Sequence, residues 1–119
     1  MESERFDLRF AVLRHEGVGE KHFDIMFETT RGSKLATWRS DQWPLTNGTI
    51  VQPLADHRPE YLEYEGKLSG GRGFVKRVSA GRHLVREDRL DRLVVKLQDG
   101  PVLTLCRSGQ AKPEVALEL

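Results

Sequence analysis

An imidazole and a carboxylate stand two residues apart in the stretch HFDIMFE, residues 22–28. Apolar and polar residues alternate through this stretch, which is typical of a β-strand with one apolar face. On the other face, the Cα atoms of His22 and Asp24 would lie roughly 6.5–7 Å apart, the distance that two residues of a strand cover. At that spacing a histidine nitrogen and a carboxylate oxygen can bind one cation, each at about 2 Å.

His15 stands seven residues before His22, across a loop that contains Gly17 and Gly19. The loop can fold back and bring His15 to the same cation as a third ligand. Two histidines and one carboxylate leave positions open for water or substrate, and this donor set suits Mn, Fe or Zn. Mg and Ca are disfavoured because they prefer oxygen ligands throughout. A surface His–Asp pair without a metal is the alternative that the spacing leaves open.

The stretch DHRPEYLEYEG, residues 56–66, holds a second pair of chemically active side chains. His57 and Tyr61 flank Pro59, which disfavours a helix and indicates a turn. A histidine and a tyrosine brought together by such a turn can hold a phosphate or protonate a leaving oxygen. Ordinary packing of a loop also accounts for this pattern.

Positive charge gathers in residues 67–86, although the net charge of the chain is only +1. The segment contains no Asp or Glu, and its basic residues are Lys67, Arg72, Lys76, Arg77, Arg82 and Arg86. Basic side chains at the edge of a sheet discourage pairing with another chain, and they can also contact a phosphate backbone. Phe74 is the only Phe, Tyr or Trp in the segment, which favours phosphate contact over base stacking. His83, beside this run, is expected at the surface or next to a bound phosphate, and not as a metal ligand.

Short strand patterns bounded by turn residues recur along the chain and must position these side chains. We expect strands at 8–14, 22–29, 34–38, 60–66, 73–79, 83–86, 93–97 and 102–107. The pair Asp99-Gly100 indicates a tight turn, and a helical turn is possible at 87–93. The pattern predicts an all-β fold, a small closed or partly open β-barrel with short helical turns. Residues 1–107 would form this single domain, and residues 108–119 a C-terminal extension.

The composition is that of a soluble globular protein, with 38% hydrophobic and 31% charged residues in 119. No apolar run approaches the roughly 20 residues that span a bilayer, and the N-terminal sequence has no signal-peptide pattern. Cys106 is the only cysteine, so it cannot form an internal disulfide; it is expected to be buried and inert. We therefore expect a cytoplasmic monomer that does not bind membranes.

Taken together, the motifs resemble the 3′-phosphoesterase domain of bacterial DNA ligase D, the end-healing module of non-homologous end joining. The resemblance runs from about Arg5 to Arg107, and the DHRPEYLEYEG stretch is its most specific part. The matching stretches are RFAVLRH at 9–15, HFD at 22–24, LATW at 35–38, ADHRPEYLEYEG at 55–66, GGRGFV at 70–75, Gly81 and VLTLCR at 102–107.

The resemblance implies a β-barrel whose pocket binds a divalent metal, Mn²⁺ above all, with Zn²⁺ or another transition metal as the alternative. It implies that His15, His22 and Asp24 bind the metal, and that His57 and Tyr61 face the scissile phosphate. The reaction that it implies removes a 3′ ribonucleotide or a 3′-phosphate from nucleic-acid ends in DNA repair. A ligase or polymerase acting in trans would then use the resulting 3′-hydroxyl.

Two basic positions of the family pattern hold other residues in this chain, namely Met26 and Thr49. An arginine at position 26 would grip phosphate, so Met26→Arg is expected to raise any phosphoesterase activity. The residues expected to contact phosphate or nucleic acid are Arg39, Arg72, Lys76, Arg77 and Arg82. A catalytically silent relative that binds nucleic-acid ends or a repair partner, with a structural metal, is the second hypothesis. A third is an interaction barrel that binds neither metal nor nucleic acid.

Overall fold

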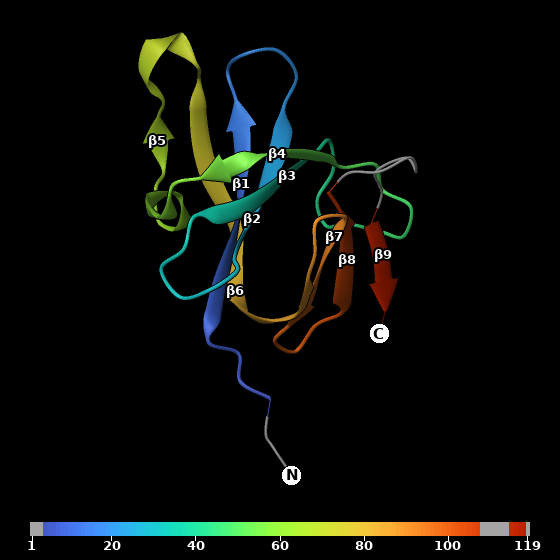
Figure 1. The fold of residues 1–119 in the computed structure, drawn as a ribbon. Helices are drawn as coiled ribbons and strands as arrows, with labels where there is room; N and C mark the ends of the chain where they lie inside the picture. The colour runs from blue at the N-terminus through green and yellow to red at the C-terminus, as the bar shows by residue number, and fades with distance from the viewer. Residues whose placement is uncertain (1–3, 108–114, 119) are drawn as a thin grey trace.

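The strands form one antiparallel sheet in the computed structural model, which describes residues 4–107 and 115–118 (Figure 1). The strands are β1 (Leu8–Glu16), β2 (His22–Glu28), β3 (Leu35–Ser40), β4 (Gln52–His57), β5 (Gly66–Lys67), β6 (Phe74–Asp88), β7 (Arg92–Leu97), β8 (Val102–Cys106) and β9 (Val115–Glu118). Their order across the nine-stranded sheet is β4-β3-β2-β1-β6-β7-β8-β9, and β5 pairs with β6. The expectation of an all-β fold is confirmed.

The sheet is not closed into a barrel, because its first and last strands, β4 and β9, do not pair with each other. The expected closed form of the barrel is therefore wrong. The segment before β4 nevertheless contacts β9: the Gly48 N–H donates to the Val115 carbonyl at 2.9 Å, and the Val115 N–H donates to Thr49 at 3.0 Å. Part of the segment expected to be an extension thus belongs to the sheet, while 108–114 lie outside the described residues.

The described residues include two short 3₁₀ turns, η1 (Pro59–Leu62) and η2 (Ser69–Gly71), and no α-helix. The strand expected at 60–66 is wrong over most of its length: Pro59 begins η1, because a proline suits the start of a helical turn, where its missing N–H would have no partner. The helical turn considered at 87–93 is not formed, since β6 and β7 make a hairpin there. No helix in the described part of the chain could cross a bilayer.

Apolar side chains pack on both faces of the sheet around β1 and β2. The larger cluster contains Phe10, Val12, Ile25, Phe27, Ala36, Trp38, Leu45, Val51, Leu93, Val95, Leu103, Leu105 and Val115. The smaller cluster, on the opposite face, contains Ala11, Leu13, Met26, Leu35, Leu62 and Val75. Leu62 of η1 belongs to the smaller cluster, so η1 is packed over this second face of the sheet.

A β-bulge in the pairing of β1 with β6 helps to hold η1 in place. Val12 pairs with Ser79 and Leu13 pairs with Arg77, so Val78 is the extra residue. The side chain of Arg77 reaches the end of η1, where its Nη1 donates to the Leu62 carbonyl at 3.0 Å. The bulge and this hydrogen bond together anchor the turn that carries Tyr61.

His83 is fully buried in the larger core, so the expectation that it lies at the surface is wrong. Its ring contacts the rings of Phe10 and Phe27 at centroid distances of 6.0 and 5.3 Å. Its Nε2 lies 2.8 Å from the Glu28 carbonyl, and Nδ1 is buried without a partner. Because a carbonyl only accepts, Nε2 carries the proton of a neutral ring.

Burial lowers the pKa of His83 below its usual value of 6.5. The unfolded chain therefore takes up a proton before the folded chain does, so stability is complete above about pH 6.5 and falls as the pH decreases below it. The free energy of unfolding is measured in urea at pH 7 and at pH 5. We expect it to decrease less between these two pH values in His83→Gln than in the wild type, because glutamine does not titrate. Parallel decreases in the two proteins would contradict this account of His83.

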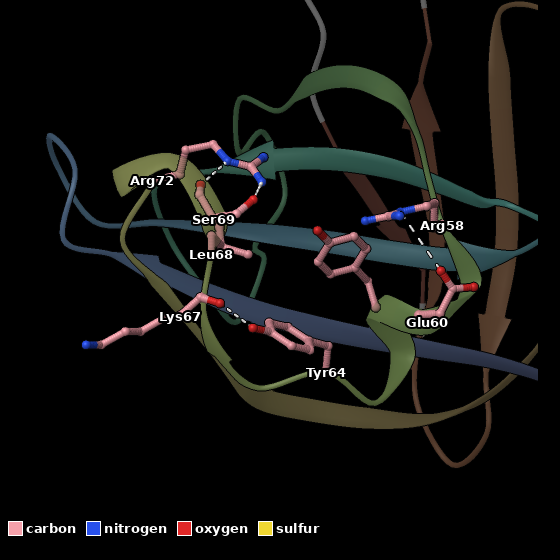
Figure 2. A pocket seen from close by; sticks show the side chains of 8 residues that line it. Arg58, Glu60, Tyr64, Lys67, Leu68, Ser69 and Arg72 are labelled. Carbon is pink, nitrogen blue, oxygen red and sulfur yellow. Dashed lines mark hydrogen bonds and ion pairs between the residues drawn. The ribbon is translucent and has the colours of Figure 1, made fainter.

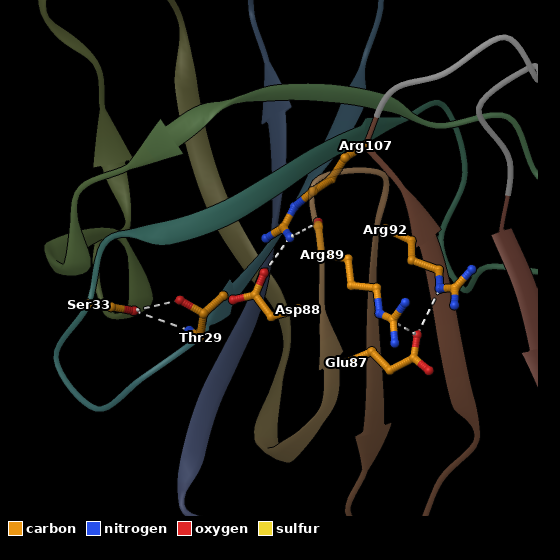
Figure 3. A network of polar contacts seen from close by, with 7 residues as sticks. All are labelled: Thr29, Ser33, Glu87, Asp88, Arg89, Arg92 and Arg107. Carbon is orange, nitrogen blue, oxygen red and sulfur yellow. Dashed lines mark hydrogen bonds and ion pairs between the residues drawn. The ribbon is translucent and has the colours of Figure 1, made fainter.

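Many cations at the end of the sheet where β6 meets β7 are paired with carboxylates (Figure 3). Arg92 donates from Nε to Glu87 at 2.8 Å, and Arg89 approaches the same oxygen at 3.8 Å. Arg107 pairs with Asp88 and donates to the Arg89 carbonyl. These ion pairs neutralise the positive charge of Arg89, Arg92 and Arg107 at this end of the sheet.

Cys106 was expected to be buried, but its side chain is only half-buried.

Candidate metal centre

Antiparallel pairing of β1 and β2 brings together the three residues expected to bind a metal. His15 lies directly opposite His22, and Asp24 follows two residues later on the same face. His15 Nδ1 is 2.9 Å from His22 Nε2, and His22 Nε2 is 3.9 Å from Asp24 Oδ1. One ligand atom from each of the three lies within 4.8 Å of the others. The loop that contains Gly17 and Gly19 was expected to bring His15 back toward His22, and the hairpin of β1 and β2 does this.

The second ring nitrogen of His15 faces a backbone carbonyl, and this contact selects the tautomer of the neutral ring. Nε2 lies 2.5 Å from the backbone carbonyl of Arg72, so in a neutral ring Nε2 carries the proton and Nδ1 presents a lone pair toward His22. Histidines that bind metals commonly donate their other N–H to a carbonyl in this way. The separation of 2.9 Å between Nδ1 and Nε2 suits a hydrogen bond, and it also suits two nitrogens about 2.1 Å from one cation.

Asp24 is a buried carboxylate that is compensated by Arg39 on the neighbouring strand. The two residues are direct partners in the pairing of β2 with β3, and Arg39 Nε donates to Asp24 Oδ1 at 3.1 Å. Burial, and next the charge of Arg39, lowers the pKa of His22. A neutral His22 is the form that offers a lone pair to a metal.

A cavity of about 210 Å³ adjoins this group and also contains the second predicted pair. Its polar lining comes from His15, Asp24, Arg39, His57, Tyr61 and Arg72, and its apolar lining from Leu13, Leu68 and Val75. The rings of His57 and Tyr61 meet edge to face at 5.7 Å. His57 Nδ1 lies 3.1 Å from the Ala55 carbonyl, so Nε2 is the acceptor nitrogen when the ring is neutral. Fold and sequence motifs thus converge on one cavity.

The five basic residues expected to bind phosphate do not form one track. Arg39 and Arg72 line the cavity, whereas Arg77 holds η1. Lys76 is exposed and, by strand alternation from Val75, projects from the other face. Arg82 is also exposed, and its Nη1 lies 3.4 Å from the Asp7 carbonyl. The cavity therefore receives two of the five.

Met26 and Thr49, where the family pattern has basic residues, are both buried. Met26 shares a face with Asp24, as the alternation predicts, but it lies in the smaller core beneath η1. Thr49 Oγ1 accepts a hydrogen bond from the Thr46 N–H at 3.0 Å and serves a turn. Arg39 instead brings a guanidinium to the cavity from β3, beside Asp24.

A groove of about 280 Å³ continues the cavity, and sequence reasoning did not find it (Figure 2). It is lined by Arg58, Glu60, Tyr61, Tyr64, Lys67, Leu68, Ser69 and Arg72. Arg58, Tyr61 and Tyr64 recur at intervals of three in the sequence, and the first and last of them flank η1 while Tyr61 lies within it. The sequence analysis expected a strand at 60–66, and a strand would not have placed these three side chains together.

A scan against protein-family models finds no match, and a search of the curated proteins finds none either. The assignment of a function to this site consequently depends on the geometry and on the motifs described above.

Proposed function

We propose that this protein is a metal-dependent phosphoesterase that processes 3′ ends of DNA or RNA during repair, removing a 3′ ribonucleotide or a 3′-phosphate. The observation that supports the proposal best is the shared cavity. His15 and Asp24, from the candidate metal group, line the same cavity as His57 and Tyr61. The sheet, open between β4 and β9, would then be the partly open form of the barrel that the resemblance implies.

The donor set of two imidazoles and one carboxylate suits Mn²⁺, Fe²⁺ or Zn²⁺. The resemblance favours Mn²⁺ among them, with Zn²⁺ as the alternative. A cation bound there would neutralise phosphate charge and provide an activated water at neutral pH. His15 would be oriented for this task by the Arg72 carbonyl. Arg39 would orient Asp24 through its Nε and retain four N–H donors on its Nη atoms.

The phosphate would be bound by Arg39 and Arg72, the two cations of the cavity. Arginine suits this role because its planar N–H groups bind two phosphate oxygens at once. His57 would carry a proton on Nε2 and donate it to the leaving oxygen, while Nδ1–H stays on the Ala55 carbonyl. The Tyr61 hydroxyl would assist in holding the same oxygen. Arg39 thus takes over the grip that Met26 cannot provide.

A silent relative that binds nucleic-acid ends, or a repair partner, is the second candidate. One observation favours it: Asp24 already has a charged partner in Arg39 at 3.1 Å, so the buried carboxylate is compensated without a metal. This candidate predicts binding of 3′ ends without turnover.

The proposal is tested with protein treated with EDTA, then assayed with and without added MnCl₂. The substrates are a primer–template that ends in one 3′ ribonucleotide and one that ends in a 3′-phosphate. We expect both to be converted to a 3′-hydroxyl only after Mn²⁺ or Zn²⁺ is added, and a 5′-phosphate to be left intact. Absence of product with either metal, together with binding of the same DNA, would replace the enzyme with the silent relative.

A further inference from the structure

We propose that the groove beside the cavity binds the retained strand of the substrate, namely the nucleotide on the 5′ side of the scissile phosphate. This inference builds on the proposed function and adds the direction in which the strand runs. Tyr61, Leu68 and Arg72 line both the groove and the cavity. A strand whose last phosphate lies in the cavity can therefore continue into the groove without leaving the protein surface.

The charge of the groove suits a phosphodiester backbone. Its lining contains three cations, Arg58, Lys67 and Arg72, against the single carboxylate of Glu60, which lies 3.9 Å from Arg58. The Arg72 guanidinium is held by Ser69, with 2.8 Å from Nε to the carbonyl and 3.0 Å from Nη2 to Oγ. A guanidinium fixed in this way loses less freedom when it binds a phosphate. Figure 2 shows Arg72 and Arg58 on opposite sides of the groove, while the side chain of Lys67 extends outward from its edge.

Aromatic rings in the same groove suit the base of that nucleotide. The rings of Tyr61 and Tyr64 meet edge to face at 5.9 Å, and the Tyr64 hydroxyl donates to the Lys67 carbonyl, which fixes its ring. Tyr64 is 39% exposed, so it remains accessible to a ligand. Stacking of a base on such a ring adds affinity that does not depend on the sequence of the strand.

A separate hollow, lined in part by His22 of the candidate metal group, has a different character. It measures about 590 Å³, and among its lining residues Lys21 and Arg39 balance Glu20 and Asp41. Balanced charge suits an uncharged nucleoside better than a chain of phosphates. We therefore place the retained strand in the groove and the leaving nucleoside in this hollow.

The test measures binding without hydrolysis, by fluorescence anisotropy of labelled oligothymidylate and oligouridylate in EDTA. We expect Arg58→Glu to weaken binding of both strands at least 10-fold, and the matched charge reversal Arg31→Glu, at an exposed residue outside the groove lining, less than 2-fold. Tyr64→Leu should weaken binding about 10-fold, because stacking is worth roughly 1–3 kcal/mol, and Tyr64→Phe should retain it. Equal losses of binding affinity in Arg58→Glu and Arg31→Glu would overturn the assignment of the groove to the retained strand.

The kinetics separate this inference from the function on which it builds. If the wild-type protein hydrolyses 3′ ends and Arg58→Glu leaves KM unchanged, the groove assignment fails while the proposed function stands. If Arg58→Glu loses binding but no metal gives turnover, the phosphoesterase fails and the groove remains a nucleic-acid site. An increase of KM at unchanged kcat in Arg58→Glu supports both.

Discussion

Replacement of His22 by alanine is expected to weaken Mn²⁺ binding at least about 100-fold, since loss even of a group that only orients a metal ligand costs about 10–100-fold. His22 lies between the other two candidate ligands, 2.9 Å from His15 Nδ1 and 3.9 Å from Asp24 Oδ1. Without it, the two remaining donors come from different positions of the hairpin and offer an incomplete set. Binding is measured by titration calorimetry with MnCl₂, and hydrolysis with the 3′-phosphate substrate.

The matched control for His22→Ala is His57→Ala, which removes an imidazole from the same cavity but not from the metal group. His57→Ala should bind Mn²⁺ like the wild type and lose about 10²–10⁴-fold in turnover, the usual contribution of a general acid. If His22→Ala retained both Mn²⁺ affinity and activity, the three residues would not be a metal site.

Met26→Arg is expected to destabilise the protein by about 3–5 kcal/mol, the cost of leaving a buried charge without a partner. Met26 is fully buried, and its neighbours in the smaller core are the apolar residues Ala11, Leu13, Leu35, Leu62 and Val75. The expectation from the sequence, that an arginine here raises activity, is thus replaced by a loss of stability and of activity. Unfolding in urea measures the change.

Met26→Leu is the conservative control, because swaps between similar hydrophobic volumes usually cost under about 1.5 kcal/mol. A folded Met26→Arg protein with wild-type stability and higher activity would show that position 26 opens into the cavity after all. The same pair of variants therefore separates core packing from phosphate binding.

Local alternation identified the faces of the strand that matters most. The pattern in HFDIMFE assigns His22 and Asp24 to one face and Ile25 to the other, and the pairing of β2 shows this arrangement. The hairpin between β1 and β2 then places His15 opposite His22. These relations are local, because they involve one strand and its neighbour in the sequence. The alternation of apolar and polar residues is sufficient to predict them.

Relations between distant strands were not predictable in the same way. The basic residues of 67–86 were expected to contact one phosphate backbone. The bulge at Val78 and the alternation of the strand instead place their side chains on different faces of the sheet. His83 faces Phe10 and Phe27 on other strands, so its burial depends on pairing across the sheet. The failure of the sheet to close likewise depends on where its two outermost strands end, which no short stretch encodes.

The last strand has a consequence for where this structural unit stops. Val115 is buried in the larger core, and its backbone is tied to Gly48 and Thr49, which precede β4 at the other end of the sheet. Two segments at opposite ends of the strand order are thereby joined by hydrogen bonds. The motifs alone suggest a boundary at Arg107. A polypeptide that ended there would expose the edge of β8 and lose the two hydrogen bonds of Val115 with Gly48 and Thr49. We therefore expect a chain truncated after Arg107 to be less stable than one that retains the strand Val115–Glu118.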